Sequence, residues 1–229
     1  MLKELKEAVF RANIDLVENG LVVHTWGNAS GKDPETGLIV IKPSGVKYDL
    51  MTPSDMVVID MDGKVVEGNR KPSTDTPTHL FLYASYASIG GIVHTHSAFA
   101  TAWAQAGKNI PALGTTHADH YYGEVPCTRK LTEEEIKKNY ELNTGKVIVE
   151  RLGNTDPMAV PSVLVNCHGP FAWGIDVEEA VYNAVALEEI ARIAFYTVLL
   201  GQKESVDRVL IEKHYRRKHG KGAYYGQKK

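Results

Sequence analysis

Apolar residues recur along the chain with two different spacings, and these spacings separate the expected helices from the expected strands. Between residues 2 and 18, leucine, alanine and valine stand at helical intervals, and Gly20 follows as a residue that can end a helix. The same reasoning predicts helices at 76–86, at 98–106, in a polar stretch after a capping box at Thr132, at 180–200 and at 204–218. Helices are therefore expected throughout the chain.

Short apolar runs bounded by glycine or proline predict the strands. These runs lie at 21–26, 38–42, 91–96 and 160–167. Two further runs, 56–60 and 64–67, flank an aspartate–glycine pair, which predicts a β-hairpin. Because short strands are mixed with helices and no glycine-rich nucleotide fingerprint follows a strand, we expect an α/β fold. Its three α/β/α layers would enclose a mostly antiparallel central sheet.

Composition and charge limit the classes of protein to which this chain can belong. The chain has 229 residues, of which 43% are hydrophobic and 24% charged, and its formal net charge is −2. These values are typical of one folded domain and exclude a disordered chain or a generally basic nucleic-acid binder. No apolar run reaches the ~20 residues of a membrane span, and no signal peptide is evident. With only two cysteines, the sequence indicates a cytoplasmic protein without a disulfide framework.

The sharpest group of candidate metal ligands is the pair His94 and His96 on an expected strand. Side chains two apart on a strand project from the same side, so both imidazoles can bind one divalent metal, although two histidines bonded to backbone carbonyls would give the same pattern. His168 ends another apolar run, and Asp75 stands where a loop meets a helix, a position that also suits an ordinary first-turn acid. Three histidines and a carboxylate suit Zn²⁺, with Mn²⁺ or Co²⁺ as substitutes. We expect Cys167, on the opposite face of its strand, to be a packing residue.

Three small polar loops offer the hydroxyl groups and glycine amides that can hold a phosphate. They lie at 26–30, 42–45 and 71–74, and the last two each contain a lysine. Serine, glycine, proline and asparagine also favour turns, so any one of these loops is explained equally well as a simple turn.

The second half of the chain holds two further candidates. Asp119 follows the polar loop 114–118, where an isolated aspartate is usually a cap or a surface residue. Residues 208–229 contain eight lysines and arginines against one glutamate, which can attract an anion or form a solvated helix face. Tyr224 and Tyr225 lie near the end of this basic tail and indicate docking onto another surface, such as a neighbouring subunit.

Taken together, these segments resemble the L-ribulose-5-phosphate 4-epimerases of the class II aldolase/epimerase superfamily. The similarity runs nearly end to end and is carried by residues 25–28, 41–46, 71–79, 90–97, 114–119, 168–174 and 213–227. The histidine–threonine–histidine motif alone is a weak signal. Segment 114–119 and the Tyr-Tyr-Gly-Gln end make the set specific for epimerases within the superfamily.

The resemblance implies roles for individual residues. It implies zinc bound by Asp75, His94, His96 and His168. It implies substrate and phosphate contacts from Gly27, Asn28, Lys42, Ser44, Gly45, Ser73, Thr74, His214 and Arg217. It implies proton transfer by Asp119 and Tyr225, with Tyr225 reaching the site of an adjacent subunit in a cyclic homotetramer. We therefore expect a single domain over 1–229 whose C-terminal helix and tail, about 204–229, complete a neighbour's site. Thr74 departs from the family, in which serine is usual, and Lys228 and Lys229 extend past the usual end.

The implied reaction is the zinc-dependent interconversion of L-ribulose 5-phosphate and D-xylulose 5-phosphate. Removal of the C4 hydrogen would give a carbanion without resonance, because C4 is β to the C2 carbonyl. Retro-aldol cleavage of the C3–C4 bond, rotation of the aldehyde and re-addition invert C4 more easily. The partner would be a small phosphorylated ketopentose, with no nucleic acid and no membrane. Two alternatives stay open: a class II sugar-phosphate aldolase with the same histidines, and a non-enzymatic adducin-like binding domain.

Overall fold

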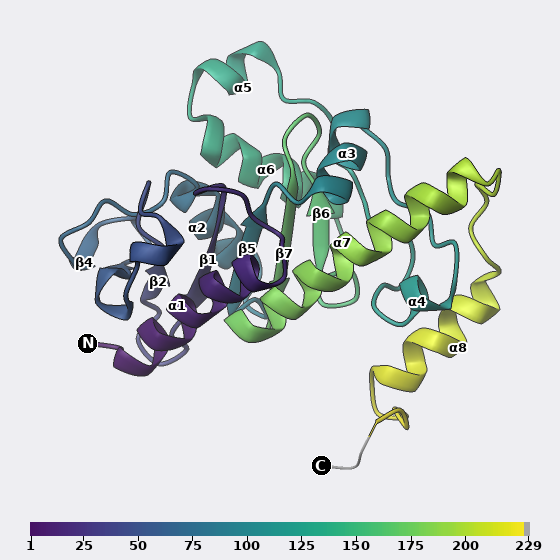
Figure 1. Cartoon of the computed structure of the whole chain (residues 1–229), viewed down its shortest axis with the longest axis horizontal. Helices are drawn as coiled ribbons and strands as arrows, with labels where there is room; N and C mark the ends of the chain where they lie inside the picture. The colour runs from purple at the N-terminus through teal and green to yellow at the C-terminus, as the bar shows by residue number, and fades with distance from the viewer. Residues whose placement is uncertain (227–229) are drawn as a thin grey trace.

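A seven-stranded antiparallel sheet forms the centre of the protein (Figure 1). The computed structural model describes residues 1–226, so Gln227, Lys228 and Lys229 at the end of the basic tail lie outside the described residues. The strands are β1 (Gly27–Lys32), β2 (Ile39–Ile41), β3 (Val57–Ile59), β4 (Val65–Glu67), β5 (Gly91–Thr95), β6 (Ser162–Leu164) and β7 (Pro170–Gly174). Their order in the sheet is β4-β3-β2-β1-β5-β7-β6, and each neighbouring pair is antiparallel.

Helices cover both faces of this sheet (Figure 1). They are α1 (Lys3–Glu18), α2 (Thr76–Ser85), α3 (Ala98–Ala106), α4 (Thr115–Ala118), α5 (Glu133–Lys137), α6 (Tyr140–Leu152), α7 (Val177–Leu199) and α8 (Arg208–Lys218), with short 3₁₀ turns at Tyr48–Leu50 and Pro53–Asp55. Because strand side chains alternate, Val40 packs with α1 and α7 on one face, whereas Ile39 and Ile41 pack with α2 and α6 on the other. The predicted three-layer α/β/α fold is confirmed.

The predicted helices and the 56–67 hairpin are largely confirmed, but one strand prediction is wrong and another is too long. Residues 21–26 form no strand; the strand is β1, whose sequence is small and polar. Strand β1 lies between β2 and β5. A side chain larger than glycine at position 31 would collide with α1, because a Cβ there would approach Leu5 Cδ1 to 2.9 Å. The run 160–167 contains only the three residues of β6 before a turn leads into β7, which the sequence did not reveal.

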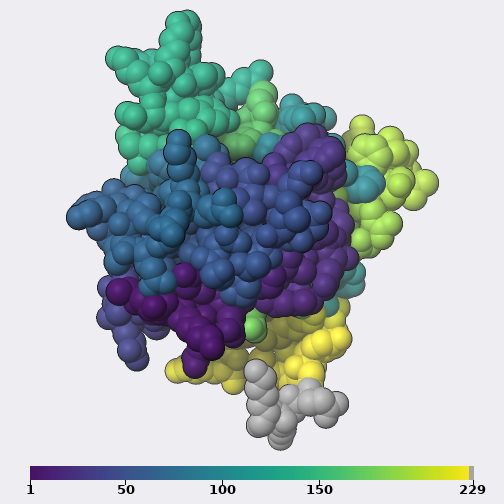
Figure 2. Space-filling view, turned by 60° about the vertical axis from the view of Figure 1, so that its left-hand side comes forward, coloured from purple at the N-terminus to yellow at the C-terminus, as the bar shows by residue number. Residues whose placement is uncertain are grey.

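Two segments extend from the layered body at opposite ends of Figure 2: α5 and the start of α6 in green, and α8 in yellow. The helix expected from residue 204 begins at Arg208. None of the helices in the described part of the chain combines the length and the apolar content that a membrane crossing requires.

Candidate functional site

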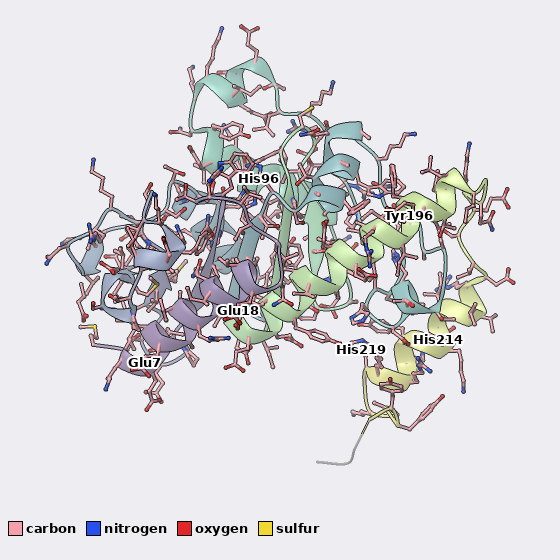
Figure 3. All side chains as sticks on the ribbon, in the orientation of Figure 1. Glu7, Glu18, His96, Tyr196, His214 and His219 are labelled. Carbon is pink, nitrogen blue, oxygen red and sulfur yellow. The ribbon has the colours of Figure 1, made fainter. Side chains whose placement is uncertain are left out.

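Three histidines from two segments of the chain meet where the central strand β5 ends. His94 lies within β5, His96 directly follows that strand, and His168 lies in the turn between β6 and β7. One ring nitrogen from each lies within 4.8 Å of the others, and the Nε2 atoms of His94 and His96 are 3.2 Å apart. Figure 3 labels His96 at this position. The fold therefore brings together the three predicted histidine ligands.

Hydrogen bonding and burial set the orientation and the protonation of these imidazole rings. His94 Nδ1 donates to the carbonyl oxygen of Pro170 at 2.9 Å, which leaves Nε2, the nitrogen that faces His96, as the one available to a metal ion. Burial lowers the pKa of His168 to about 3, with a further contribution from His94, and burial likewise lowers the pKa of His96. His96 and His168 are therefore neutral near pH 7, which is the form that binds metal ions.

The β6–β7 turn presents His168 and explains one wrong expectation. The turn is closed by hydrogen bonds from Val165 N to Gly169 O at 2.9 Å and from His168 N to Val165 O at 3.0 Å. Cys167 takes a left-handed conformation with φ of 63° and is exposed to solvent. It is therefore a turn residue and not the packing residue that strand alternation predicted.

Asp75 lies beside the histidines at the start of α2. Its Oδ2 accepts a hydrogen bond of 2.7 Å from Asn28 Nδ2, and its carboxylate caps no amide of its own helix. Burial opposes ionisation of this carboxyl, but the neighbouring His94 and His79 and the bond from Asn28 hold its pKa below the usual value. The set of donor atoms within 4.8 Å contains the three histidines and not Asp75. Three imidazole nitrogens with a carboxylate beside them fit a divalent ion such as Zn²⁺.

A cavity of about 420 Å³ opens in front of Asp75 and the three histidines. Its walls are Thr25, Trp26, Gly27, Thr74, Asp75, His94, His96, Tyr140, Glu141 and His168. Gly27 has φ of 117°, and a Cβ there would approach the carbonyl oxygen of His94 to 2.8 Å, so glycine is required at this wall. The sequence did not point to Tyr140 and Glu141 as residues of this cavity. Tyr140 contacts His168 Nδ1 through its hydroxyl at 3.3 Å, but no motif marks it, because only the fold brings α6 to this cavity.

Two of the candidate phosphate loops lie side by side. Ser44 N donates to Lys71 O at 2.9 Å, and Ser73 N donates to Lys42 O at 3.0 Å, so the loops pair as a short antiparallel bridge. The side chains of Ser44 and Thr74 are exposed, Gly45 has open space where a Cβ would stand, and Ser73 is buried. Hydroxyl groups and a glycine amide are therefore available on one surface.

Lys42 is turned inward and holds one of these loops. Its Nζ donates to the carbonyl oxygens of Pro43 at 3.3 Å and Val46 at 3.2 Å, and it lies 4.7 Å from the centre of the Tyr48 ring. Burial lowers the pKa of Lys42 to about 8. In this conformation the ammonium group of Lys42 holds the loop 43–46 in place through these two carbonyl oxygens.

A second group of predicted residues gathers around Asp119, directly after α4. Its carboxylate accepts two hydrogen bonds from Arg217, at 2.9 Å from Nε and 2.6 Å from Nη2, and one of 3.1 Å from His214 Nδ1. The ring of Tyr225 lies 4.8 Å from the Arg217 guanidinium, and Tyr225 N donates to Arg217 O. Four residues that the sequence assigned to catalysis or substrate contact therefore form one cluster between α4 and α8.

The cavity lined by His94, His96 and His168 and the cluster around Asp119 lie apart within one chain. The residues that line the cavity include none of the four in the cluster. In Figure 3, His96 and His214 are labelled on different parts of the molecule. The structure of one chain therefore contains two separate groups of the predicted site residues.

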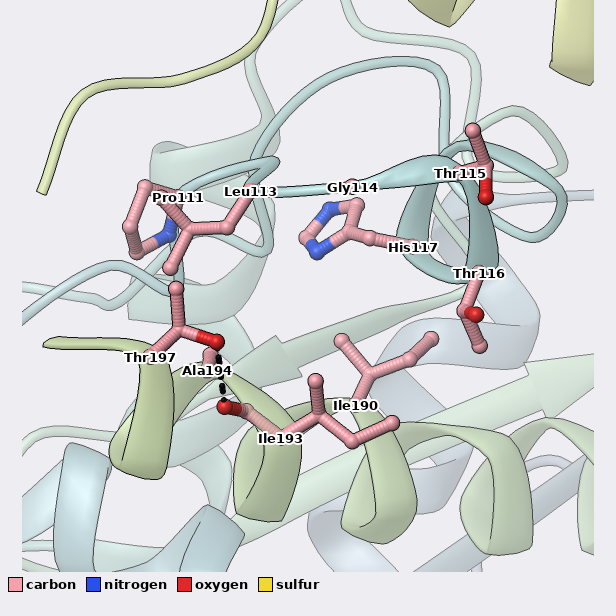
Figure 4. A pocket seen from close by; sticks show the side chains of 10 residues that line it. All are labelled: Pro111, Leu113, Gly114, Thr115, Thr116, His117, Ile190, Ile193, Ala194 and Thr197. Atoms are coloured by element: carbon pink, nitrogen blue, oxygen red, sulfur yellow. Dashed lines mark hydrogen bonds between the residues drawn. The ribbon is translucent and has the colours of Figure 1, made fainter. Parts of the chain in front are cut away.

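The segment 114–119 also borders a smaller cavity of about 220 Å³ between α4 and α7 (Figure 4). His117 points into it from α4, opposite Ile190 and Ala194. His117 Nε2 donates to Gly123 O at 2.6 Å, and burial lowers the pKa of the ring to about 4. The segment 114–118, expected as a polar loop, thus contains the short helix α4, and the imidazole of His117 points inward from it.

The docking of α8 onto Asp119 is expected to loosen in acid. Burial raises the pKa of Asp119, but hydrogen bonds from Arg217 and His214 outweigh it and hold the pKa below its usual value of about 3.9. A depressed folded-state pKa gives stabilisation that is complete above the ordinary value and is lost as pH falls through the lowered one. Amide protection in α8, which is the exchange rate corrected for its intrinsic pH dependence, should fall as pH drops below the ordinary aspartate pKa of about 3.9. Asp119→Asn, which cannot titrate, should show weaker protection of α8 at neutral pH and no such step in acid; an identical step would contradict the assignment.

Comparison with known proteins agrees with this architecture. The family model described as "Class II Aldolase and Adducin N-terminal domain" matches residues 7–195. A solved L-fuculose 1-phosphate aldolase is 28% identical, with a TM-score of 0.79 and coverage of 92% of this chain and 94% of that chain. The l-fuculose-1-phosphate aldolase from Thermus thermophilus is 26% identical, with a TM-score of 0.68 and coverage of 87% and 98%. The aldolase from Glaciozyma antarctica, at 19% identity and a TM-score of 0.78 over 96% and 84%, supports the fold alone.

The family match spans most of the chain, from α1 to the C-terminal part of α7, and includes the three clustered histidines. The antiparallel sheet and its helical layers agree with the solved relatives over nearly the whole chain. The protein belongs to the class II aldolase and adducin N-terminal domain family.

Proposed function

We propose that the protein is an enzyme that interconverts L-ribulose 5-phosphate and D-xylulose 5-phosphate in the cytoplasm, with zinc as cofactor. The observation that carries this proposal is the cavity in which His94, His96 and His168 converge beside Asp75, next to two paired loops rich in hydroxyl groups. A cation site beside a potential phosphate site suits a small phosphorylated sugar.

His94, His96 and His168 would hold the metal, with Asp75 as the adjacent carboxylate. A divalent metal there supplies Lewis-acid stabilisation of negative charge that develops on sugar oxygens. Asn28 fixes one oxygen of Asp75 through the 2.7 Å bond and leaves the other available to the cavity. The protein side chains thus orient the donor atoms before a ligand arrives.

Ser44, Gly45, Ser73 and Thr74 are the proposed phosphate anchor, with Gly27 and Asn28 contacting the substrate nearby. Retention of the phosphate matters because epimerisation requires that the aldehyde fragment rotates without leaving. Lys42 contributes by holding the loop in the conformation described above. Pre-ordered donors of this kind favour rebinding of the same fragment.

Asp119 and Tyr225 are the proposed proton-transfer pair for the C4 oxygen, and His214 and Arg217 align them. Because their cluster is apart from the metal cavity in one chain, we propose that they act on the cavity of an adjacent subunit in a cyclic homotetramer. Head-to-tail contacts of this type close into rings. The protein would then be a single domain whose tail, about 204–229, completes its neighbour's site.

Incubation with L-ribulose 5-phosphate, with and without a chelator, tests the proposal. Formation of D-xylulose 5-phosphate without free aldehyde, lost on chelation and restored by Zn²⁺, is expected. Absence of the epimer from metal-loaded protein would refute it.

The alternative function is a class II sugar-phosphate aldolase, which the named relatives at 28% and 26% identity favour. Release of a free aldehyde and a ketose phosphate from L-fuculose 1-phosphate would identify that activity. The clustered histidines argue against an adducin-like binding domain without a metal. If the protein binds no divalent metal, that third function becomes the favoured one.

Tyr225→Phe is expected to slow epimerisation about 10²-fold or more, because it removes one proton donor. The phenyl ring keeps the contact with Arg217, so the tail should stay in place. Steady-state turnover, measured beside the oligomeric state, checks this expectation. A variant tetramer with full epimerase activity would show that the phenol is dispensable.

A further inference from the structure

A buried polar cluster lies between β1 and α2, behind the proposed metal centre. Ser30 Oγ is 2.8 Å from His79 Nδ1 and 2.8 Å from the hydroxyl of Tyr83, which also donates to the Ser30 carbonyl oxygen at 3.1 Å. Ser30 and His79 have no exposed surface, and Tyr83 is 2% exposed. None of the three lines the cavity.

The periodicities of strand and helix align this cluster with Asp75. Asn28 and Ser30 are two apart on β1, so their side chains share one face of the sheet. Asp75, His79 and Tyr83 follow one another at intervals of four along the start and body of α2, so they share one face of that helix. The facing rows give two neighbouring contacts: Asn28 with Asp75 at 2.7 Å, and Ser30 with His79 and Tyr83.

A second contact joins His79 to a metal ligand through one aromatic ring. Phe171 stacks on His94 with ring centres 4.2 Å apart and planes inclined by 16°. The ring of His79 meets Phe171 edge-on, with centres 6.1 Å apart. His79 therefore supports the ring against which His94 rests, as well as the strand that carries Asn28.

We propose that His79 is a positioning residue of the metal centre, acting through Ser30 on Asp75 and through Phe171 on His94. The inference rests on the proposed metal-binding role of the histidine triad and extends it to residues that touch neither metal nor substrate. By fixing β1 against α2, the cluster holds the Asp75 carboxylate at the angle that Asn28 can bond. Outer contacts of this kind orient ligands and tune their affinity for the metal.

The chemistry of His79 argues against simple core packing. Its Nε2 is buried and makes no hydrogen bond within residues 1–226, which is unfavourable for a polar atom. A leucine would fill a similar volume without that cost. A retained imidazole is explained if the bond from Nδ1 to Ser30 and the edge contact with Phe171 are both needed.

Two substitutions separate hydrogen bonding from volume. His79→Leu keeps apolar bulk against Phe171 and removes the bond to Ser30. His79→Asn places an amide near the position of Nδ1 and can keep that bond. Co²⁺ is titrated into metal-free full-length protein well below its unfolding temperature, and binding is followed by the visible absorption of Co²⁺ and by competition with a chelator. His79→Leu should bind Co²⁺ about 10–100-fold more weakly with an altered spectrum, whereas His79→Asn should retain most of the affinity.

A matched control separates positioning from general stability. Tyr121 and Ser162 form another fully buried hydroxyl pair, 2.8 Å apart, whose members do not line the metal cavity. Ser162→Ala should lower the unfolding temperature without changing Co²⁺ affinity. If His79→Leu does not fold, Ser30→Ala removes the same bond with a smaller change and should weaken Co²⁺ binding in the same direction.

The outcomes distinguish this inference from the proposed function. Wild-type affinity and spectrum in folded His79→Leu, or in Ser30→Ala where that variant replaces it, would overturn the positioning role and leave the metal centre intact. A wild-type protein that binds no Co²⁺ would overturn both. Weakened binding in the variant of a protein that lacks epimerase activity would support the positioning role while refuting the proposed reaction.

Discussion

His96→Ala is expected to abolish metal-dependent activity and to lower metal occupancy together. His96 offers its Nε2 at 3.2 Å from that of His94, and its removal leaves two imidazoles to hold the ion. If the Lewis acid contributes about 4 kcal/mol to transition-state stabilisation, activity should fall roughly a thousand-fold or more. Metal content after dialysis and turnover with saturating substrate are the two measurements.

His24→Asn is the matched control for this loss. His24 is another exposed histidine near the cavity, with its ring 5.8 Å from that of Trp26, but it is not one of the clustered ligands. Asparagine tolerates the left-handed conformation of residue 24, whose φ is 55°. The control should keep full metal content. Unchanged zinc stoichiometry in His96→Ala would remove His96 from the ligand set.

Asp119→Asn is expected to keep zinc and the fold while epimerase activity falls about 10²–10⁴-fold, the usual contribution of a general acid or base. The amide offers one acceptor oxygen where the carboxylate binds both Arg217 and His214, so the charge and the alignment of the cluster are lost together. The proposed metal ligands are untouched, because the cluster shares no residue with their cavity. Turnover and zinc content measured on the same sample check both halves of the expectation.

Asp15→Asn is the control for loss of an aspartate–arginine pair as such. Asp15 pairs with Arg11 on α1 at 2.8 Å, in a partly exposed position where such a pair contributes little. This variant should remain fully active. Near-normal turnover of Asp119→Asn would remove Asp119 from the mechanism, and loss of zinc from that variant would show that its defect is indirect.

The helices were predictable because burial on one face imposes a regular spacing over many residues. The α1 pattern and the capping box at Thr132 are both local features, and both occur in the structure. Strands β1 and β7 were not predictable in the same way. The sequence of β1 is small and polar, and it forms a central strand only because β2 and β5 supply its partners on either side.

The residues of the candidate site likewise divide into those that a local pattern predicts and those that only the fold brings together. His94 and His96 follow from strand alternation alone, whereas His168 reaches them through the β6–β7 turn, which the single expected strand 160–167 did not contain. Tyr140 and Glu141 carry no sequence signal, and they line the cavity because α6 packs against α2. Contacts between distant segments decided these positions.

The sequence by itself determined the layered α/β class, most helices and the identity of the donor atoms, because periodicity and side-chain chemistry are local properties. Tertiary structure alone decided that three histidines share one point, that Asn28 holds Asp75, and that Arg217 gathers Asp119 and Tyr225 elsewhere. These relations depend on strand order and on the packing of α2 and α8. Such contacts join residues that are far apart along the chain, and local patterns do not specify them.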